Sequence, residues 1–332
     1  MSGPTFFFDT PLVKCTNLPI GEQQEVYFKF ENLQPSGSFK DRGISTMVNE
    51  ILKTETVGKL ISSSGGNAGH AVATVGQKLG IPVDVYVPMT TKPMMIAKLK
   101  KKGAHVFVHG ANWNEADKLA RQAVAADSTA QYIPPYDDPR IWEGNSTIVD
   151  DLAKAGIVPD KIVLSVGGGG LLAGIQRGIL RHNWQNRTKV VAVETEGAAS
   201  FARAHEAGQQ PVTLSAITSI ASSLGALSVT PGCLNTGVET IPHVVSDADA
   251  VRACRWLADD FKMLVEPACG AALSYVYCPH PTVTRSVIEN EVETAPTAVG
   301  ETIVVIVCGG SVVNIELLAQ WCKEFDVSSE YL

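Results

Sequence analysis

Lys40 lies within PSGSFKDRG at residues 35–43, where an amine stands between an aromatic ring and turn-forming residues. Pro35 and Gly37 favour a turn, and Phe39 offers an apolar face. A lysine held in such a partly desolvated place loses part of its preference for the charged form. Because a neutral amine attacks aldehydes, Lys40 is a candidate for Schiff-base chemistry. The ordinary alternative is an exposed lysine near the start of a helix.

Two glycine-rich segments each lie between a predicted strand and a predicted helix, SSSGGNAG at 62–69 and GGGG at 167–170. At the carboxyl end of a strand, glycines let backbone N–H groups turn toward an anion, and the helix N-terminus adds partial positive charge. One loop would suit a phosphate and the other a carboxylate, although tight packing alone would also explain either loop. With a reactive lysine, a phosphate loop indicates a phosphorylated aldehyde such as pyridoxal phosphate.

The elements that must position these residues alternate between short β-branched strands and helical patterns. The predicted strands are VYFKFE, KLISSS, VDVYVP, HVFVHG, KIVLSV, VVAVET and TIVVIVC. Apolar residues recur at helical spacing between them, as in NEADKLARQAVAA and LLAGIQRGIL, and SDAD at 246–249 is typical of a helix start. This alternation predicts an α/β fold with doubly wound, mostly parallel sheets. The turn-rich IPPYDDP at 133–139 predicts an internal boundary.

Composition favours a small-molecule partner. The 332 residues are 45% hydrophobic, enough for one large or two ordinary domains. The formal charge of −7, from 27 basic and 34 acidic side chains, provides no broad positive field for nucleic acid or anionic lipid. The basic run KLKKKG at 98–103 is typical of a solvated helix end.

The cysteines and the apolar segments predict a cytoplasmic protein. Seven scattered cysteines include no C-x-x-C pair, and the histidines show no metal-ligand spacing, so reduced thiols are expected. Apolar runs such as IVVIVC are too short to cross a bilayer. The N-terminal segment MSGPTFFFDT lacks the basic part of a signal peptide.

A dinucleotide-binding loop is an alternative for the GGGG segment. Gly168, Gly170 and Ala173 satisfy G-x-G-x-x-A, and Glu194 ends the next predicted strand, where a ribose-binding acid belongs. This alternative, an NAD-dependent dehydrogenase, leaves PSGSFK and SSSGGNAG without a role.

A non-catalytic sensor of pyridoxal phosphate or of an amino acid is a further alternative.

Seven segments in order resemble the serine/threonine dehydratases of the fold-type-II pyridoxal phosphate enzymes. They are PSGSFKDRG, SSSGGNAG, YIPPYDDPRIWEG, LSVGGGGLLAG, VETEGAASF, LVEPACGAAL and VVIVCGGS. The resemblance covers nearly the whole chain and implies a tryptophan synthase β-like architecture. It implies a large cofactor domain at 1–38 and 138–332 and a small domain with the substrate loop at 39–137. Threonine synthases and cysteine synthases have related lysine motifs and are the alternatives within this fold type.

The resemblance implies an ammonia-lyase that converts L-serine or L-threonine to a 2-oxo acid and ammonia. Lys40 would bind the cofactor aldehyde and remove the Cα proton, and the β-hydroxyl would leave as water with a proton from the cofactor phosphate. Lys40 and Ser64 are the implied catalytic residues. The implied cofactor-binding residues are Phe39, Lys40, Asn67, Gly167, Gly168, Gly169, Gly170, Leu171, Cys308 and Gly309. The implied substrate carboxylate site is Ser64, Gly65, Asn67 and Ala68.

Cys308 is expected to set the type of reaction. In the dehydratases that the chain resembles, a thiol faces the pyridine nitrogen and keeps it largely unprotonated, which favours elimination over transamination. The ordinary alternative is a buried cysteine that acts as a small hydrophobe.

The resemblance also implies a potassium site, held by Glu194, Ala198, Ser200, Leu224 and Ala226. A strand-ending carboxylate beside a capping serine is the ordinary alternative. Gly65 stands where the most similar dehydratases have alanine, so we expect a pocket larger by a methyl. Racemases of the family have at this position a serine that can reprotonate the opposite face, and Gly65 has no such proton, so we expect little racemisation. The chain ends soon after CGGS, so we expect no regulatory domain, and relatives suggest a homodimer.

Overall fold

The computed structural model describes residues 6–16, 18–20, 24–278 and 300–327. Residues 1–5, part of the segment MSGPTFFFDT, lie outside this range. The chain divides into two compact units, unit 1 with residues 1–8 and 33–145, and unit 2 with residues 9–32 and 146–332. The domain borders expected after residues 38 and 137 stay a prediction. Each unit has its own sheet, and the predicted α/β class with mostly parallel strands is confirmed.

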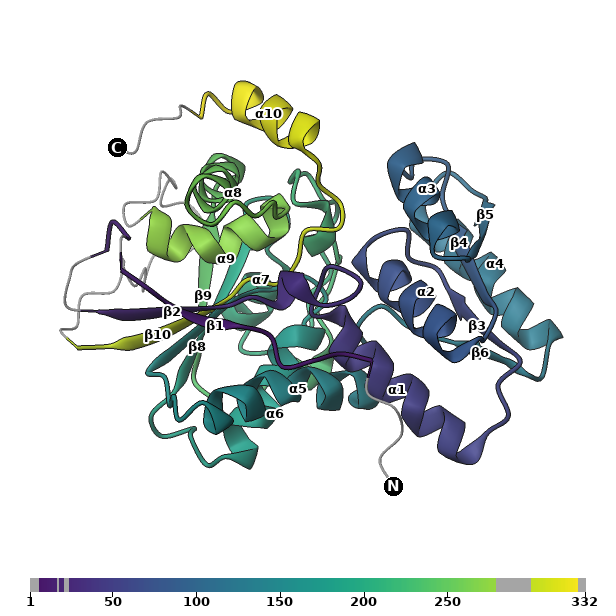
Figure 1. Ribbon diagram of the computed structural model, residues 1–332, viewed down its shortest axis with the longest axis horizontal. Coiled ribbons are helices and arrows are strands. Elements are labelled where there is room, and N and C mark those ends of the chain that lie inside the picture. Colours follow the sequence, from purple (N-terminus) through teal and green to yellow (C-terminus); the bar gives the residue numbers. More distant parts are fainter. Residues whose placement is uncertain (1–5, 17, 21–23, 279–299, 328–332) are drawn as a thin grey trace. The chain divides into compact units, whose positions relative to one another are not determined.

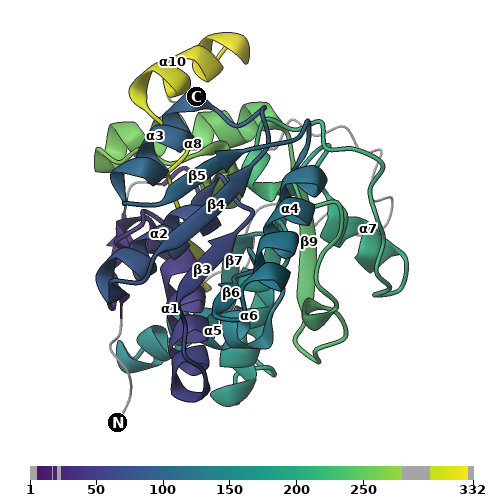
Figure 2. The ribbon, with the colours of Figure 1, turned by 90° about the vertical axis from the view of Figure 1, so that its right-hand side faces the viewer.

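Unit 1 alternates strands and helices along one parallel sheet. Its elements are α1 (Lys40–Thr54), β3 (Lys59–Ser62), α2 (Asn67–Leu79), β4 (Val83–Val87), α3 (Pro93–Lys101), β5 (His105–Val108), α4 (Trp113–Ala126) and β6 (Ala130–Tyr132). The strand order is β5-β4-β3-β6. Figure 2 shows α4 on one face of this sheet and α2 and α3 on the other. Because all four strands are parallel, the segments that follow β3 and β6 leave the sheet at the same edge.

Unit 2 contains a larger sheet with the order β1-β2-β10-β7-β8-β9. Its strands are β1 (Leu12–Cys15), β2 (Glu25–Lys29), β7 (Lys161–Ser165), β8 (Lys189–Thr195), β9 (Thr240–Val245) and β10 (Thr302–Ile306). Its helices are α6 (Gly170–Arg181), α7 (Ser200–Glu206), α8 (Asp247–Phe261), α9 (Pro267–Tyr277) and α10 (Ile315–Glu324), with short 3-10 turns η1 (Glu31–Leu33), η2 (Ser222–Leu224) and η3 (Pro231–Cys233). Helix α5 (Pro139–Lys154) crosses the border between the units. β1 runs antiparallel to β2, and the other described pairs are parallel.

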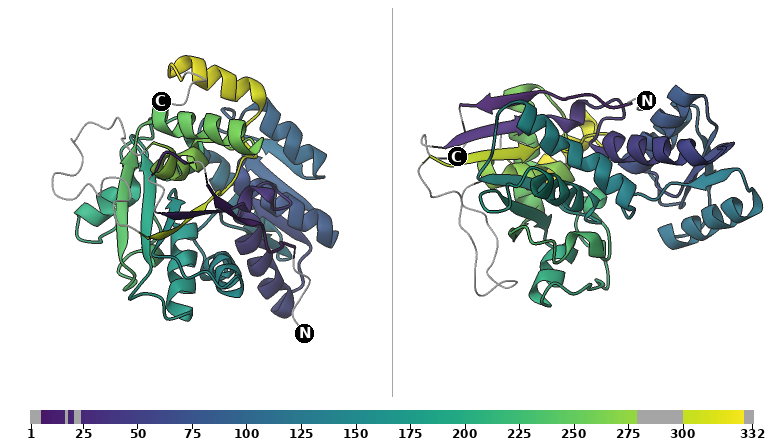
Figure 3. Two further views of the ribbon diagram at one scale, coloured as in Figure 1. Left: turned by 60° about the vertical axis from the view of Figure 1, so that its left-hand side comes forward. Right: turned by 90° about the horizontal axis from the view of Figure 1, so that it is seen from below.

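Helices cover both faces of the larger sheet. α9 packs on β7 and β8, and α8 packs on α9. Figure 1 shows these two helices on one side of the sheet and α6 on the other, and the left view of Figure 3 shows the same layers with α8 and α9 in green and α6 in teal. The central strands are therefore buried on both faces, which explains why TIVVIVC is continuously apolar.

Local capping explains where several helices begin. The Ser246 hydroxyl accepts the N–H of Asp249 at 3.1 Å and starts α8, so the helix start predicted at SDAD is confirmed. The Asn112 side chain accepts the N–H of Glu115 at 3.2 Å and starts α4 in the same way.

Among the helices of the described residues, none combines the length and the apolar character that crossing a membrane requires.

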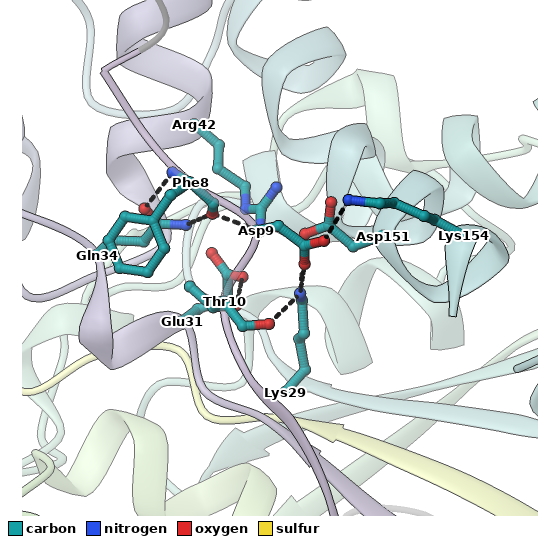
Figure 4. A network of polar contacts seen from close by, with 9 residues as sticks. All are labelled: Phe8, Asp9, Thr10, Lys29, Glu31, Gln34, Arg42, Asp151 and Lys154. Carbon is teal, nitrogen blue, oxygen red and sulfur yellow. Dashed lines mark hydrogen bonds and ion pairs between the residues drawn. The ribbon is translucent and has the colours of Figure 1, made fainter. Parts of the chain in front are cut away.

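An ion cluster around the buried Lys29 fixes the end of β2 in unit 2 (Figure 4). Lys29 is 1% exposed, and its Nζ lies 3.0 Å from Asp9 Oδ1, 2.8 Å from Asp151 Oδ2 and 2.7 Å from the Thr10 carbonyl. Lys154 reaches the other Asp9 oxygen at 3.1 Å. Removing both carboxylates would leave the buried Lys29 ammonium uncompensated, and an uncompensated buried charge typically costs about 3–5 kcal/mol. The cluster therefore fixes β2 against α5.

Candidate active site

Lys40 is the first residue of α1, and its side chain contacts a carbonyl oxygen and an aromatic ring. Its Nζ donates to the Pro135 carbonyl at 2.6 Å and lies 5.1 Å from the centroid of the Phe39 ring. The N-terminus of a helix carries partial positive charge, so an ammonium group is poorly placed there. The carbonyl and the ring compensate part of this cost. The predicted contact of Phe39 with a cofactor stays a prediction.

The predicted substrate loop joins β3 to α2. Ser64 donates its N–H to Ser62 Oγ at 3.4 Å and accepts the N–H of Gly66 on its own hydroxyl at 3.3 Å. Asn67 and Ala68 are the first two residues of α2, so this loop lies at the amino end of a thirteen-residue helix. A helix N-terminus favours a carboxylate, which is the chemistry that the sequence predicted for this segment.

Gly69 is a site-shaping residue that the sequence analysis did not single out. A Cβ built on Gly69 would overlap the carbonyl oxygen of Ser64. The first turn of α2 therefore packs directly against the backbone of the substrate loop. The signal was present as the last glycine of SSSGGNAG, but one sequence does not show which glycines of a loop are sterically required.

The expectation that Gly65 enlarges the pocket by a methyl group is wrong. A Cβ on this residue would lie 2.9 Å from Thr91 Cγ2 and 3.2 Å from Val87 Cγ1. The space that a methyl group would occupy is therefore filled by side chains of the same unit. Spacing along the sequence could not show that Thr91 fills it.

The four-glycine loop of unit 2 turns from β7 into α6 and packs closely on neighbouring backbone. A Cβ on Gly167 would lie 3.0 Å from Leu224 Cα, and one on Gly169 would lie 2.8 Å from Cys233 Sγ. Gly169 also has φ of +83°, a left-handed conformation that side chains rarely adopt. Glycine is therefore required at position 169, and a side chain at position 167 would displace the backbone around Leu224 by a few tenths of an ångström.

Donor groups of this loop remain available for an anion. The Gly168 carbonyl accepts the N–H of Thr230 at 2.9 Å, and the Gly169 carbonyl accepts that of Ala173 at 2.8 Å. The N–H groups of Gly167, Gly168 and Gly169 donate to no described residue. They adjoin the N-terminus of α6, whose first turn contains Gly170 and the buried Leu171. A phosphate is the ligand that such an arrangement favours.

Cys308 follows β10 and is 7% exposed. A hydrogen bond with the Cys269 thiol, together with burial, raises the pKa of the Cys308 thiol well above its usual range. Cys308 is therefore a protonated thiol at neutral pH, and it is not joined in a disulfide. The adjoining Gly309 carbonyl accepts the N–H of Glu266 at 3.4 Å, which fixes this turn against the start of α9.

Glu194 is a fully buried carboxylate at the end of β8. It accepts the N–H groups of Phe201 and Ala202, both at 2.8 Å, and burial raises the pKa of this carboxyl to about 8. The Ser200 hydroxyl beside them is buried without a partner among the described residues. The model thus brings Glu194 and Ser200 together and places Leu224 against the glycine loop. The described residues contain no cluster of three or more His, Cys, Asp or Glu side chains that could hold a metal ion.

The candidate residues belong to both compact units. Unit 1 contains Phe39, Lys40, Ser64, Gly65, Asn67 and Ala68. Unit 2 contains Gly167, Gly168, Gly169, Gly170, Leu171, Glu194, Ala198, Ser200, Leu224, Ala226, Cys308 and Gly309.

Comparisons with known proteins agree with this chemistry. The family model described as "Pyridoxal-phosphate dependent enzyme" matches residues 5–309. The chain is 41% identical over 314 residues to "Serine dehydratase-like" from Mus musculus, covering 94% of this chain and 92% of the relative. It is 37% identical over 345 residues to "L-serine dehydratase" from Saccharomyces cerevisiae (strain AWRI1631), covering 98% and 99%.

A solved structure, a fungal L-serine ammonia-lyase from Rhizomucor miehei, is similar over 97% of this chain and 100% of its own, with a TM-score of 0.86 and 34% identity. The family match spans most of the chain, and two relatives exceed a third in identity over nearly their full length. The chain therefore belongs to the family of pyridoxal-phosphate dependent enzymes.

Proposed function

We propose that this protein is an ammonia-lyase that converts L-serine to pyruvate and ammonia. The observation that carries this proposal is the similarity, over nearly the whole chain, to a yeast L-serine dehydratase and to the solved L-serine ammonia-lyase. Support also comes from unit 1, where a lysine begins one helix and the N-terminus of another helix would favour a carboxylate, two groups that such a reaction requires.

The residues present fit pyridoxal phosphate. Lys40 would bind its aldehyde, and the N–H groups of Gly167, Gly168 and Gly169, which donate to no described residue, would bind its phosphate together with the start of α6. The protonated Cys308 would face its pyridine nitrogen. When bound, the cofactor withdraws electrons from the substrate Cα and so acidifies the Cα proton.

The residues of unit 1 would handle the substrate and its proton. The N–H groups at the start of α2 would bind the substrate carboxylate, with Ser64 and Asn67 on either side of the turn. The Lys40 amine would also accept the Cα proton of the substrate. The Pro135 carbonyl, 2.6 Å from Nζ, would then orient this amine.

Direct assay tests the proposed activity. Purified protein supplied with pyridoxal phosphate should release ammonia and pyruvate from L-serine. Lys40→Ala should lose this activity, whereas Lys53→Ala, an exposed lysine on the same helix, should retain it. L-threonine, assayed beside L-serine, tests a second substrate suggested by the 25% identity and TM-score of 0.82 to a threonine deaminase from Solanum lycopersicum. A wild-type protein that releases ammonia from neither amino acid would refute the proposal.

A potassium ion at Glu194 is a second part of the proposal. The buried Glu194 carboxyl group and the Ser200 hydroxyl, which has no partner among the described residues, support it, because both offer hard oxygen atoms to a monovalent cation, and a bound cation would favour the ionised form of Glu194. The carbonyls of Ala198, Leu224 and Ala226 would complete the site. Exchange of potassium for tetramethylammonium should lower the activity, and an unchanged rate would count against the ion.

The proposal includes a cytoplasmic homodimer. Seven cysteines that are all free thiols suit a reducing compartment. Cell fractionation tests the compartment, and light scattering of the purified protein tests the dimer.

A further inference from the structure

Asp117 is a carboxylate on the face of α4 that packs against the sheet of unit 1. Its neighbours Ala116 and Ala120 are fully buried, and Ala120 packs in a core cluster with Ile61 and Tyr86. A carboxylate on such an apolar face requires donors to offset its loss of hydration. Three side chains donate hydrogen bonds to Asp117, and two of them come from the carboxyl edge of the sheet.

Two hydroxyl groups meet on one oxygen of Asp117. Ser63 Oγ lies 2.7 Å from Asp117 Oδ1, and the Tyr132 hydroxyl also donates to Oδ1. The two hydroxyl oxygens are 2.9 Å apart. The two hydroxyl groups have two protons between them and three possible contacts, namely Ser63 with Asp117, Tyr132 with Asp117, and Ser63 with Tyr132. Each hydroxyl proton therefore always has an acceptor within reach. Hydrogen bonds from Tyr132, Arg121 and Ser63 outweigh desolvation and hold the pKa of Asp117 below its usual range, so the carboxylate stays ionised.

Arg121 completes the group from one turn further along α4. Its Nε donates to Asp117 Oδ2 at 2.7 Å, and its guanidinium lies 4.4 Å from the centroid of the Tyr132 ring. It therefore contacts both the carboxylate and the tyrosine. Both Asp117 oxygens have donors in this arrangement, which fixes the orientation of the carboxylate.

The two hydroxyl residues begin the two segments that carry the proposed chemistry of unit 1. Ser63 is 0% exposed and immediately precedes Ser64 in the substrate loop. Tyr132 ends β6 and immediately precedes the segment 133–135, whose last carbonyl accepts Lys40 Nζ. The N–H of Ile133 also donates to the Ile61 carbonyl at 2.8 Å, so the two strand ends are joined by backbone as well.

We propose that Asp117 is a positioning residue that sets the substrate loop relative to the segment holding Lys40, acting through the hydroxyls of Ser63 and Tyr132. This inference rests on the proposed function and deepens it, since it names a determinant of carboxylate binding outside the binding loop. Asp117 itself contacts no reacting atom. Its effect is exerted on the position of Ser64 and of the N-terminus of α2.

The test compares Asp117→Asn with Asp84→Asn. Asp84 is a matched control because it is also a buried carboxylate of unit 1 with side-chain partners, Lys59 at 2.8 Å and His105 at 3.2 Å. It differs from Asp117 in its position, since it lies near the amino end of the strands, away from the substrate loop. Glycine is the probe for binding, since it has the substrate amine and carboxylate but no β-hydroxyl to lose. Equilibrium dialysis with labelled glycine measures its dissociation constant on the cofactor-loaded protein.

Asp117→Asn should raise the glycine dissociation constant and the KM for L-serine by about tenfold, and kcat/KM should fall about 10- to 100-fold, since small displacements of a binding group have effects of this size. Tyr132→Phe, which removes a single hydroxyl, should change both in the same direction by less. Asp84→Asn should lower thermal stability and leave both binding quantities within twofold. Where Asp117→Asn does not fold, Tyr132→Phe decides.

A glycine dissociation constant in Asp117→Asn or Tyr132→Phe equal to that of the wild type would overturn the inference, whatever the change in stability. Equal losses in the Asp84 and Asp117 variants would also overturn it, because they would indicate a purely structural role. Wild-type protein that binds glycine but releases no ammonia from L-serine would contradict the proposed function alone, and the glycine comparison would still decide on Asp117. Wild-type protein that does not bind glycine would overturn the inference about Asp117, and the ammonia assay would still decide on the proposed function.

Discussion

Lys40 Nζ donates a 2.6 Å hydrogen bond to the carbonyl of Pro135, a residue 95 positions further along the chain. The lysine begins α1 and the proline follows β6, so the contact is formed by tertiary folding within unit 1. A backbone carbonyl accepts a hydrogen bond but does not become protonated at neutral pH. It therefore orients the Lys40 amine and leaves the amine as the group that would take up the Cα proton. The contact therefore gives the free Lys40 amine, which is the proposed base, a defined direction.

Gly69→Ala should disable the substrate loop, because the added Cβ would overlap the Ser64 carbonyl. We expect kcat/KM for L-serine to fall at least about 100-fold, since the loop backbone must move to admit the methyl group. Gly80→Ala, at the other end of α2, is the control. Gly80 has φ of +69° and no neighbour within 4 Å of a built Cβ, so its replacement should cost ~1 kcal/mol of stability and little activity. Steady-state kinetics and urea unfolding of both variants measure this contrast.

Gly65→Ala should lower kcat/KM through contact with Thr91. The new Cβ would lie 2.9 Å from Thr91 Cγ2, so we expect a loss of about three- to tenfold, equal to ~1 kcal/mol of overpacking. The double variant Gly65→Ala with Thr91→Ser lacks the offending methyl and should regain most of the activity. A double variant as impaired as Gly65→Ala would show that the methyl groups do not compete for this space.

Cys308→Asp should shift the reaction from elimination toward transamination. Burial and the Cys269 thiol keep Cys308 protonated, whereas a carboxylate at this position would favour a protonated pyridine nitrogen and a stronger electron sink. Cys308→Ser keeps a neutral group and should preserve the wild-type partition. The ratio of pyruvate to pyridoxamine phosphate formed during turnover measures this partition. An unchanged ratio in Cys308→Asp would remove Cys308 as the determinant of reaction type.

His70 should make unit 1 sensitive to acid. It is 4% exposed, its Nε2 has no partner among the described residues, and burial followed by the charges of Lys98 and Lys102 lowers its pKa from 6.5 to about 4. The unfolded chain therefore takes up a proton first, and folding stability is lost as the pH falls from about 6.5 toward 4. At pH 4.5 this loss is ~2–3 kcal/mol relative to pH 7.

His70→Leu should remove this part of the acid sensitivity and raise stability, because a buried polar atom without a partner is eliminated. His109→Leu, at an exposed position in the same unit, is the control. Denaturant unfolding at pH 7 and pH 4.5 gives the difference for each variant. An acid loss in His70→Leu as large as in the wild type would exclude His70 as its source.

Sequence patterns predicted the alternation of strands and helices, because each of these elements has a buried face or a capping residue that repeats in the sequence. The helix start at Ser246 and the strand from Thr302 are examples. Helix α9 was not predicted as a helix, since PACGAALSYVY is buried along its whole length and shows no polar face. β9 was also missed, because Pro242 in an edge strand weakens the strand signal.

The candidate site was only partly predictable for a related reason. Lys40 and the glycine loops are local features whose residue types indicate their chemistry. Asp117, in contrast, looks like an ordinary polar residue of an amphipathic helix, and its partners Ser63 and Tyr132 are 54 and 15 residues away. Thr91 likewise contacts Gly65 only after β4 and the following turn have folded. Such contacts are set by the packing of distant segments and leave no periodic signal in the sequence.

The central claim is that the Lys40 amine binds the aldehyde of pyridoxal phosphate. Reduction of the cofactor-loaded protein with borohydride, followed by peptide mapping with mass spectrometry, tests it most directly. We predict a pyridoxyl group on the peptide that contains Lys40, and its absence in Lys40→Ala. A wild-type protein with no adduct at Lys40, or with the adduct on another lysine, would contradict the claim.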